Sequence, residues 1–194
     1  MWKIFEGEAG SYDRWYDKNE EIFEKEVECI KSLIEGKNKA EIGVGTGRFA
    51  EKLGVDVGID ASLDMLKIAK KRKIKLVRGD AHNLPFKSQV FDCLLFIVTL
   101  CFLDNPTKAL NEANRVLKLN GKLIVAIVPK DSELGKMYIQ KAKRGHKFYS
   151  KARFYTVEEV ENMLRYAGLK VIDLKSIGIV SDSDFVCIKA LKVR

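Results

Sequence analysis

The stretch AEIGVGTGRFA, residues 40–50, joins a short apolar strand, three glycines at every second position, and the start of a helix. Glycine permits a tight turn and lets a ligand approach the backbone, and the free N–H groups at a helix start attract anionic groups. A Walker loop needs GxxxxGK[ST] and a dinucleotide site needs GxGxxG, but here Arg48 stands at the last glycine position. The turn therefore predicts a bound ligand and disfavours a phosphate cradle.

Short apolar strands alternate with helical stretches on both sides of this turn. Alternation of this kind indicates right-handed βαβ units and a parallel sheet with helices on both faces. The strands are expected at 39–44, 55–60, 73–79, 90–98 and 121–128, and the helices at 47–53, 62–72, 106–118 and 156–168. Two final apolar runs, 169–180 and 184–193, have no helix between them and predict a hairpin. The fold class is therefore α/β: a Rossmann-like, doubly wound sheet of seven strands, parallel except for one antiparallel strand near the C-terminal edge.

An N-terminal helix precedes this pattern. Apolar residues recur at helical spacing over residues 14–34, Ser11 and Asp13 suit its start as caps, and Gly36 suits its end. With 194 residues, 46% of them hydrophobic, the chain fits one compact domain. We expect a single domain over 1–194, with residues 1–36 as a helical cap.

Two aspartates end the next two expected strands. VGID ends with Asp60, 17 residues after Gly43, and VRGD ends with Asp80, 20 residues later. In a doubly wound sheet, ligands lie outside the carboxyl ends of the strands. Asp60 can accept hydrogen bonds from both hydroxyls of a ribose, and Asp80 can accept one from an amino group on a base. The glycine turn and both aspartates thus predict one binding site at this rim.

At this point the sequence resembles the class I S-adenosylmethionine (SAM)-dependent methyltransferases, of the UbiE/Methyltransf_11-like type, over residues 12–194. The resemblance rests on EIGVGTGRF, VGIDASLDML, VRGDAHNLPF, FDCLLFIVTLCFLDNP and ALNEANRVLKLNGKLIVAIV, in that order. It implies SAM as cofactor and S-adenosylhomocysteine (SAH) as product. The cofactor-binding residues that the resemblance implies are Glu41, Gly43, Gly45 and Gly47 for the methionine part, Asp60 and Ala61 at the ribose, Asp80 and Ala81 at the adenine, and Phe96 and Ile97 beside the sulfonium.

No catalytic base follows from the sequence. Methyl transfer from a sulfonium is an in-line displacement, so positioning in a dry pocket can supply much of the catalysis. Many relatives carry a histidine where this chain has Phe102 in LCFL, residues 100–103. The chain lacks the NPPY, DPPY and Pro-Cys elements of nucleic-acid amino and cytosine-C5 enzymes. Cys101 lies in an apolar run, where packing explains it.

The acceptor side is expected in the segment 131–153, a candidate substrate lid, and around Tyr12. Residues 67–78 and 136–153 each hold seven basic residues and no acidic one, whereas residues 1–35 hold ten acidic against five basic. The lid's bases bind an anionic or aromatic acceptor, or they pair with the acidic N-terminal helix. His82, His146, Tyr16, Arg14 and Met65 are further residues that either contact ligands or serve packing alone.

Composition limits the other classes. The longest apolar run, residues 93–103, is shorter than a membrane span needs, and the acidic N-terminus does not fit a secretory signal. Four dispersed cysteines without clustered histidines indicate reduced thiols and no metal site. We expect a cytoplasmic protein without a membrane partner; abundant Lys and Glu with only two Gln is a bias of thermophilic proteins.

The leading interpretation is a methyltransferase acting on a small-molecule acceptor. Methylation of RNA or protein through the basic surfaces stays open, as does a catalytically inactive SAM-binding scaffold. A nicotinamide oxidoreductase is a weaker alternative because of Arg48 and the final hairpin. The acceptor, the accepting atom and the oligomeric state do not follow from the sequence.

Overall fold

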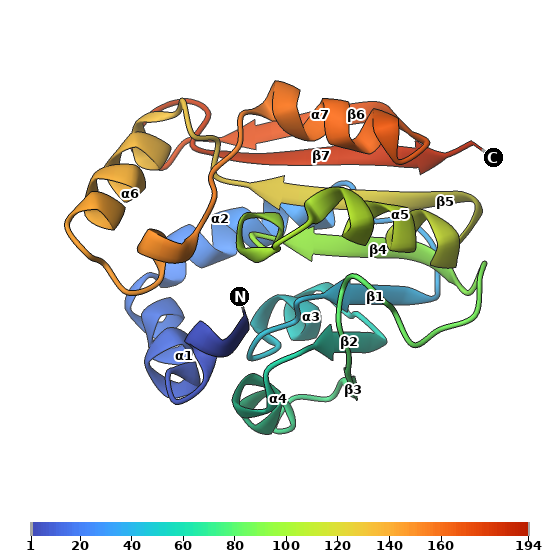
Figure 1. The fold of residues 1–194 in the computed structure, drawn as a ribbon, viewed down its shortest axis with the longest axis horizontal. Coiled ribbons are helices and arrows are strands. Elements are labelled where there is room, and N and C mark those ends of the chain that lie inside the picture. The colour runs from blue at the N-terminus through green and yellow to red at the C-terminus, as the bar shows by residue number, and fades with distance from the viewer. Residues whose placement is uncertain (1, 194) are drawn as a thin grey trace.

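A computed structural model describes residues 2–193 as one seven-stranded sheet with helices on both faces (Figure 1). The strand order is β3-β2-β1-β4-β5-β7-β6. All neighbouring strands pair in parallel except β7, which is antiparallel to both β5 and β6. The strands are β1 (Lys39–Ile42), β2 (Val57–Asp60), β3 (Lys75–Arg78), β4 (Phe91–Ile97), β5 (Leu117–Ile127), β6 (Leu169–Ile177) and β7 (Phe185–Lys192). The predicted fold class and the C-terminal hairpin are confirmed.

Helices connect the strands and cover both faces of the sheet. The α-helices are α1 (Ala9–Lys18), α2 (Glu20–Lys31), α3 (Arg48–Leu53), α4 (Leu63–Ala69), α5 (Pro106–Val116), α6 (Glu133–Lys143) and α7 (Val157–Tyr166). Short 3₁₀ helices are η1 (Trp2–Phe5), η2 (Leu100–Phe102) and η3 (Tyr149–Lys151). Side-chain caps explain several starts: Asn105 precedes Pro106 in α5, and Thr156 forms a capping box with Glu159 in α7. None of the helices in the described part of the chain is both long and apolar enough to cross a membrane.

The expected single N-terminal helix is wrong in its bounds, because two helices occupy this region. The break falls at Asn19, where φ is −130° and ψ is 40°, and the Asn19 side chain donates to the Trp15 carbonyl at 2.7 Å. Ser11 and Asp13 lie inside α1 rather than capping it. Asp13 instead accepts hydrogen bonds from Arg48. Tertiary ion pairing has therefore replaced the local capping role.

Alternate residues of the central strands build a separate core on each face of the sheet. In β4, Leu94 and Phe96 face the core that contains α5 and α7. Cys93 and Leu95 face the core beneath α2 and α3. This period of two follows from strand geometry, and burial of both faces explains the continuous apolar run of β4.

Candidate active site

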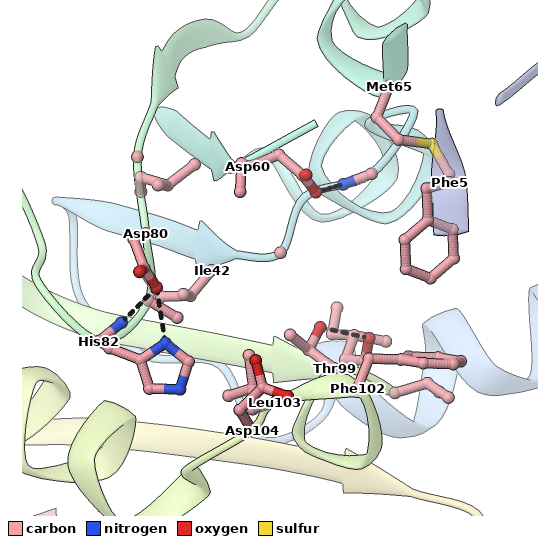
Figure 2. A pocket seen from close by; sticks show the side chains of 18 of the residues that line it. Phe5, Ile42, Asp60, Met65, Asp80, His82, Thr99, Phe102, Leu103 and Asp104 are labelled. Atoms are coloured by element: carbon pink, nitrogen blue, oxygen red, sulfur yellow. Dashed lines mark hydrogen bonds and ion pairs between the residues drawn. The ribbon is translucent and has the colours of Figure 1, made fainter. Parts of the chain in front are cut away.

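One cavity lies beyond the carboxyl ends of β1 to β4, with about 950 Å³ of empty space that is partly open to solvent. Figure 2 shows strand-end residues on one side of this rim cavity and aromatic rings on another. The predicted residues that line it include Gly43, Gly45, Asp60, Ala61, Asp80 and Ala81. Ile97 lines it as well. The fold thus brings together four segments that are distant in sequence.

The glycine turn shows two different uses of glycine. Gly43 has φ of +75°, and a Cβ there would lie 2.4 Å from Cγ2 of Thr99, so a larger residue would displace that side chain. Gly47 has φ of +83° and does not line the cavity; a Cβ there would lie 3.0 Å from Cδ1 of Ile74. Gly43 therefore shapes the rim, whereas Gly47 allows α3 to start close to the residues after α4.

Asp60 fastens the turn after β1 to the turn after β2. Its Oδ2 accepts from the Gly45 N–H at 2.8 Å, and its Oδ1 accepts from the Ser62 N–H at 2.8 Å. Burial raises the pKa of Asp60 in spite of these hydrogen bonds. Each carboxylate oxygen has more than one acceptor site, so Asp60 retains capacity for ligand hydroxyls.

Asp80 is held by His82. Asp80 Oδ1 accepts from the His82 backbone N–H at 2.9 Å and lies 2.6 Å from His82 Nδ1. The backbone N–H of Asn105 donates to His82 Nε2 at 3.2 Å, so Nε2 is the acceptor of the ring and Nδ1 is the nitrogen that donates to Asp80. Burial alone would raise the pKa of Asp80, but the hydrogen bonds from His82 lower it. His82 therefore orients Asp80 instead of standing as a separate base.

Four aromatic rings from four segments form a roof over the rim cavity. The Phe5 ring stacks on Phe148 with centroids 5.6 Å apart and meets Phe102 edge-on at 5.1 Å and Tyr12 at 6.1 Å. Phe5, Tyr12 and Phe102 line the cavity. Phe5 does not follow from the sequence, because no local pattern marks a ring whose partners all lie along distant parts of the chain.

Polar contacts hold the roof in place. Ser62 Oγ donates to Glu6 Oε1 at 2.7 Å, and the Gly7 N–H donates to Asp64 Oδ2 at 2.9 Å. Lys147 forms an ion pair with Glu8 at 2.5 Å. The N-terminal segment is therefore tied to the start of α4 and to the segment that follows α6.

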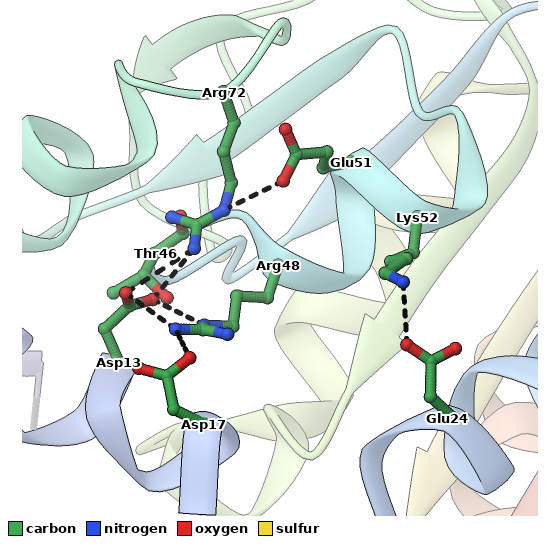
Figure 3. Close-up of polar contacts among 8 residues, drawn as sticks. All are labelled: Asp13, Asp17, Glu24, Thr46, Arg48, Glu51, Lys52 and Arg72. Atoms are coloured by element: carbon green, nitrogen blue, oxygen red, sulfur yellow. Dashed lines mark hydrogen bonds and ion pairs between the residues drawn. The ribbon is translucent and has the colours of Figure 1, made fainter. Parts of the chain in front are cut away.

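A cluster of ion pairs joins α1 to the glycine turn (Figure 3). Asp13 accepts from Arg48 at 2.8 and 3.0 Å and from Arg72 at 3.2 Å. Arg48 also contacts Asp17, and Arg72 donates to the Thr46 carbonyl at 2.7 Å. Arg48 occupies the position of the last glycine in the dinucleotide motif GxGxxG. Its side chain holds α1 against the glycine turn.

Comparisons with known proteins agree with this geometry. A family model described as a methyltransferase domain matches residues 40–125, which contain the strand ends of the rim cavity. An uncharacterized protein from Methanocaldococcus jannaschii is 46% identical over 169 residues, covering 87% of this chain and 82% of that protein. A crystal structure from Thermotoga maritima, of a SAM-dependent methyltransferase and possible histamine N-methyltransferase, has a TM-score of 0.91 and 37% identity, covering 99% of this chain and all of that one. The chain belongs to the class I SAM-dependent methyltransferases.

The predicted family, enzyme class and cofactor are thereby confirmed. A demethylmenaquinone methyltransferase from Renibacterium salmoninarum is 39% identical over 99 residues, which are 48% of this methyltransferase and 42% of that one. This match supports the UbiE-like type but covers less than half of either protein.

The residues at the rim fit the cofactor in most of the predicted positions. Glu41 does not line the cavity, but it is 2% exposed and its Oε2 has no hydrogen-bond partner. Burial, and then the nearby Asp60 carboxylate, raise the pKa of Glu41 well above its usual range. A buried carboxyl next to the glycine turn, with one oxygen that has no partner among the described residues, suits a donor group of the methionine part.

Phe96 and Ile97, both expected beside the sulfonium, differ in position. The Phe96 side chain is fully buried in the core under α5 and does not line the cavity. Ile97 and Val98 line it. Successive strand residues face opposite sides, which is why Phe96 and Ile97 separate.

Val98 is the strained residue of the site. Its φ is +49°, a left-handed conformation that is a genuine outlier for a β-branched side chain. The Val98 N–H donates to the Ala126 carbonyl at 2.9 Å, which holds the turn after β4 in place. Neither the strain nor the role of Val98 was visible in the sequence, because an apolar valine continues the strand pattern.

Among the other candidate residues, Cys101, His146 and Arg14 do not line the rim cavity. Cys101 contacts the Val98 carbonyl, and burial raises the pKa of its thiol to about 12, so it is no nucleophile at neutral pH. His146 is exposed and stacks on Tyr149, and Arg14 is exposed and does not line the cavity. Met65 is buried but lines it. Across residues 2–193, no three His, Cys, Asp or Glu side chains are placed to hold a metal ion.

Proposed function

We propose that this methyltransferase binds SAM in the rim cavity and transfers its methyl group to a small-molecule acceptor. The observation that carries the proposal is the convergence of Gly43, Gly45, Asp60, Asp80 and Ile97 on one cavity from four strand ends. Ligands of doubly wound folds bind at this edge.

The assigned contacts follow the chemistry of each side chain. The backbone of Gly43 and Gly45, with Glu41 behind it, holds the methionine part. Asp60 accepts from the ribose hydroxyls, and Asp80 with the Ala81 N–H binds the adenine. His82 keeps Asp80 oriented through the 2.6 Å contact between Nδ1 and Oδ1.

Bound SAM would supply an electrophilic methyl group: the acceptor's lone pair would form the new bond, the carbon–sulfur electron pair would stay on sulfur to give SAH, and the acceptor's proton would pass to bulk solvent as the product leaves. Phe5 and Phe102 exclude water from the reacting centre. Val98 fixes the backbone beside that centre through its bond to Ala126. These residues act by positioning and by excluding water, and no side chain is assigned as a base.

Residues 1–36 serve as a cap and residues 131–153 as a lid over the acceptor. Support comes from the aromatic roof, in which Phe5 and Phe148 meet directly. Several bases of the two basic segments are engaged within the chain: Lys147 with Glu8, Lys136 with Glu133 and Arg72 with Asp13. A cavity that is only partly open to solvent, with several nearby bases paired within the chain, favours a small molecule over RNA.

Calorimetric titration with SAM and SAH tests the cofactor site. We expect micromolar binding by the wild type, a loss of at least about tenfold in Asp60→Asn, and no change in Asp182→Asn, whose side chain is exposed. Equal binding by Asp60→Asn contradicts the assignment.

Transfer of labelled methyl from SAM to compound pools then separates an enzyme from an inactive scaffold. The first compounds to include are histamine, because the Thermotoga protein is described as a possible histamine N-methyltransferase, and demethylmenaquinone, which the name of the Renibacterium protein contains. Transfer to RNA alone, with steep salt dependence, would contradict a small-molecule acceptor.

A further inference from the structure

A second pocket lies behind the rim cavity and shares Val98 and Phe102 with it. It lies between η2, the end of β5, α6 and the segment around η3. Its walls include Cys101, Ile127, Tyr138, Tyr149, Phe154 and Tyr155. Since Val98 and Ile97 lie where the reactive end of the cofactor is proposed, this inner pocket is next to the transferred methyl group.

The walls of the inner pocket are uncharged and largely aromatic. Tyr138 and Tyr149 stack with centroids 4.2 Å apart and planes 15° apart, and Phe154 lies 6.4 Å from each. Among the described residues, no Lys, Arg, Asp, Glu or His side chain lines this pocket. The lid therefore turns rings, rather than its basic side chains, toward the acceptor.

The uncharged, aromatic walls of the inner pocket determine which kind of ligand it can bind. A charged group moved into an apolar pocket without a partner loses its hydration at a high cost in free energy. Flat rings, in contrast, pack well against aromatic faces and edges.

Tyr155 adds one polar point to this pocket. Its side chain is 7% exposed, and its Oη is buried without a hydrogen-bond partner. The residue is held on both sides: its carbonyl accepts from the Lys130 N–H at 2.9 Å, and the Arg153 guanidinium lies 5.5 Å from the ring centre. Buried hydroxyls are nearly always hydrogen-bonded, so an unpartnered one in a pocket wall points to a partner on a ligand.

We propose that the inner pocket is the methyl-acceptor subsite and takes an uncharged, flat aromatic group, with one polar atom of that group hydrogen-bonded to the hydroxyl of Tyr155. The proposal rests on the function proposed above, because it places the acceptor beside the bound cofactor. It narrows the acceptor from an anionic or aromatic molecule to an aromatic one.

Three matched probes test it: phenol, its saturated counterpart cyclohexanol, and its anionic counterpart 4-hydroxybenzoate. Their binding to SAH-loaded protein is measured by ligand-observed NMR. Phenol is expected to bind at least about tenfold more tightly than either counterpart. Tyr155→Phe is expected to weaken phenol binding about five- to tenfold, the effect of one lost hydrogen bond, while SAH affinity stays unchanged.

Tyr166→Phe is the matched control, because Tyr166 is 85% exposed on α7. Since Tyr155→Phe removes only an unpartnered oxygen, its thermal unfolding midpoint should not fall, which separates the binding effect from a folding defect. Equal binding of cyclohexanol, equal or tighter binding of 4-hydroxybenzoate, an unaffected Tyr155→Phe, or no phenol binding would each overturn the proposal. SAH binding is measured separately, so its failure defeats the cofactor assignment alone. The probes are also titrated without SAH, so that the inner pocket is tested even in that case.

Discussion

At the scale of single residues, Glu26 is a buried carboxyl in an aromatic environment. It is 7% exposed on α2, and burial, with a smaller effect of Cys29, raises its pKa to about 8. Its charge in turn helps to raise the pKa of Tyr12 and Tyr138. The folded protein therefore keeps a proton at Glu26 at neutral pH.

This proton predicts a pH-dependent stability. An unfolded glutamate has a pKa near 4.5, so between about pH 4.5 and 8 the folded state binds a proton that the unfolded state has lost, and the free energy of unfolding falls as pH rises. Glu26→Gln removes this slope. We expect it to equal the wild type at pH 5 and to exceed it at pH 8 by on the order of 3 kcal/mol, in urea unfolding.

Glu28→Gln is the control, since Glu28 is exposed on the same helix. If the stability difference between Glu26→Gln and the wild type were the same at pH 5 and pH 8, the raised pKa would be wrong.

His82 leads to a second residue-scale prediction. His82→Ala removes the ring between Asp80 and the Asn105 N–H. SAH affinity is expected to fall about three- to tenfold, because Asp80 is no longer oriented, and calorimetry measures the loss. His146→Ala, a change at the exposed lid histidine, should leave SAH affinity unchanged. A comparable loss of SAH affinity in that variant would contradict the role of His82 in orienting Asp80.

Most of the cavity's cofactor side follows from sequence patterns, and the exceptions have physical reasons. Asp60 and Asp80 stand at strand ends, which a strand–turn–helix pattern locates well. Phe96 and Ile97 are neighbours in the apolar part of β4, residues 93–97, so no polar alternation tells which of them lines the cavity. Phe5 lines the site only through contacts with distant segments, which local patterns do not contain.

At the scale of elements, the attachment of α1 to the glycine turn determines how the N-terminal cap, residues 1–36, is arranged. Helical spacing continues through Asn19, so periodicity alone predicted one helix over 14–34. The bonds from Asp13 to Arg48 and Arg72 place α1 against α3 and the residues after α4. Tertiary ion pairing of this kind overrides weak helix propensity.

Asp13→Asn tests that attachment. It leaves two largely buried guanidinium groups without their shared carboxylate, so the thermal unfolding midpoint should fall by about 2–4 °C. Asp17→Asn is the milder counterpart, because Asp17 is more exposed and contacts only Arg48. A larger effect of Asp17→Asn would argue against Asp13 as the anchor.

The lid offers a further element-scale prediction. Lys147→Glu and Glu8→Lys each place like charges at the ion pair between the lid and the N-terminal segment. Each single variant should exchange the amide hydrogens of residues 133–151 faster than the wild type at low salt. The double swap should restore slow exchange, and failure to restore it would show that the pair does not hold the lid.

At the scale of the whole molecule, alternation of strands and helices predicted the sheet and its C-terminal hairpin. The prediction succeeded because parallel neighbouring strands need a crossover connection, usually a helix. Two strands without a helix between them can pair as an antiparallel hairpin. The arrangement of the roof was less accessible, since it depends on η1, α1, η2 and the segment after α6 meeting over one cavity. Long-range packing of aromatic side chains, rather than local propensity, fixes that meeting point.

A crystal structure of the protein with SAH would decide whether the rim cavity is the cofactor site. We expect adenine against Asp80 and Ala81, ribose hydroxyls on Asp60, and the sulfur beside Val98 and Phe102, facing the inner pocket. SAH bound outside the rim cavity, or bound in it with the adenine at Val98 and Phe102, would contradict the proposed site.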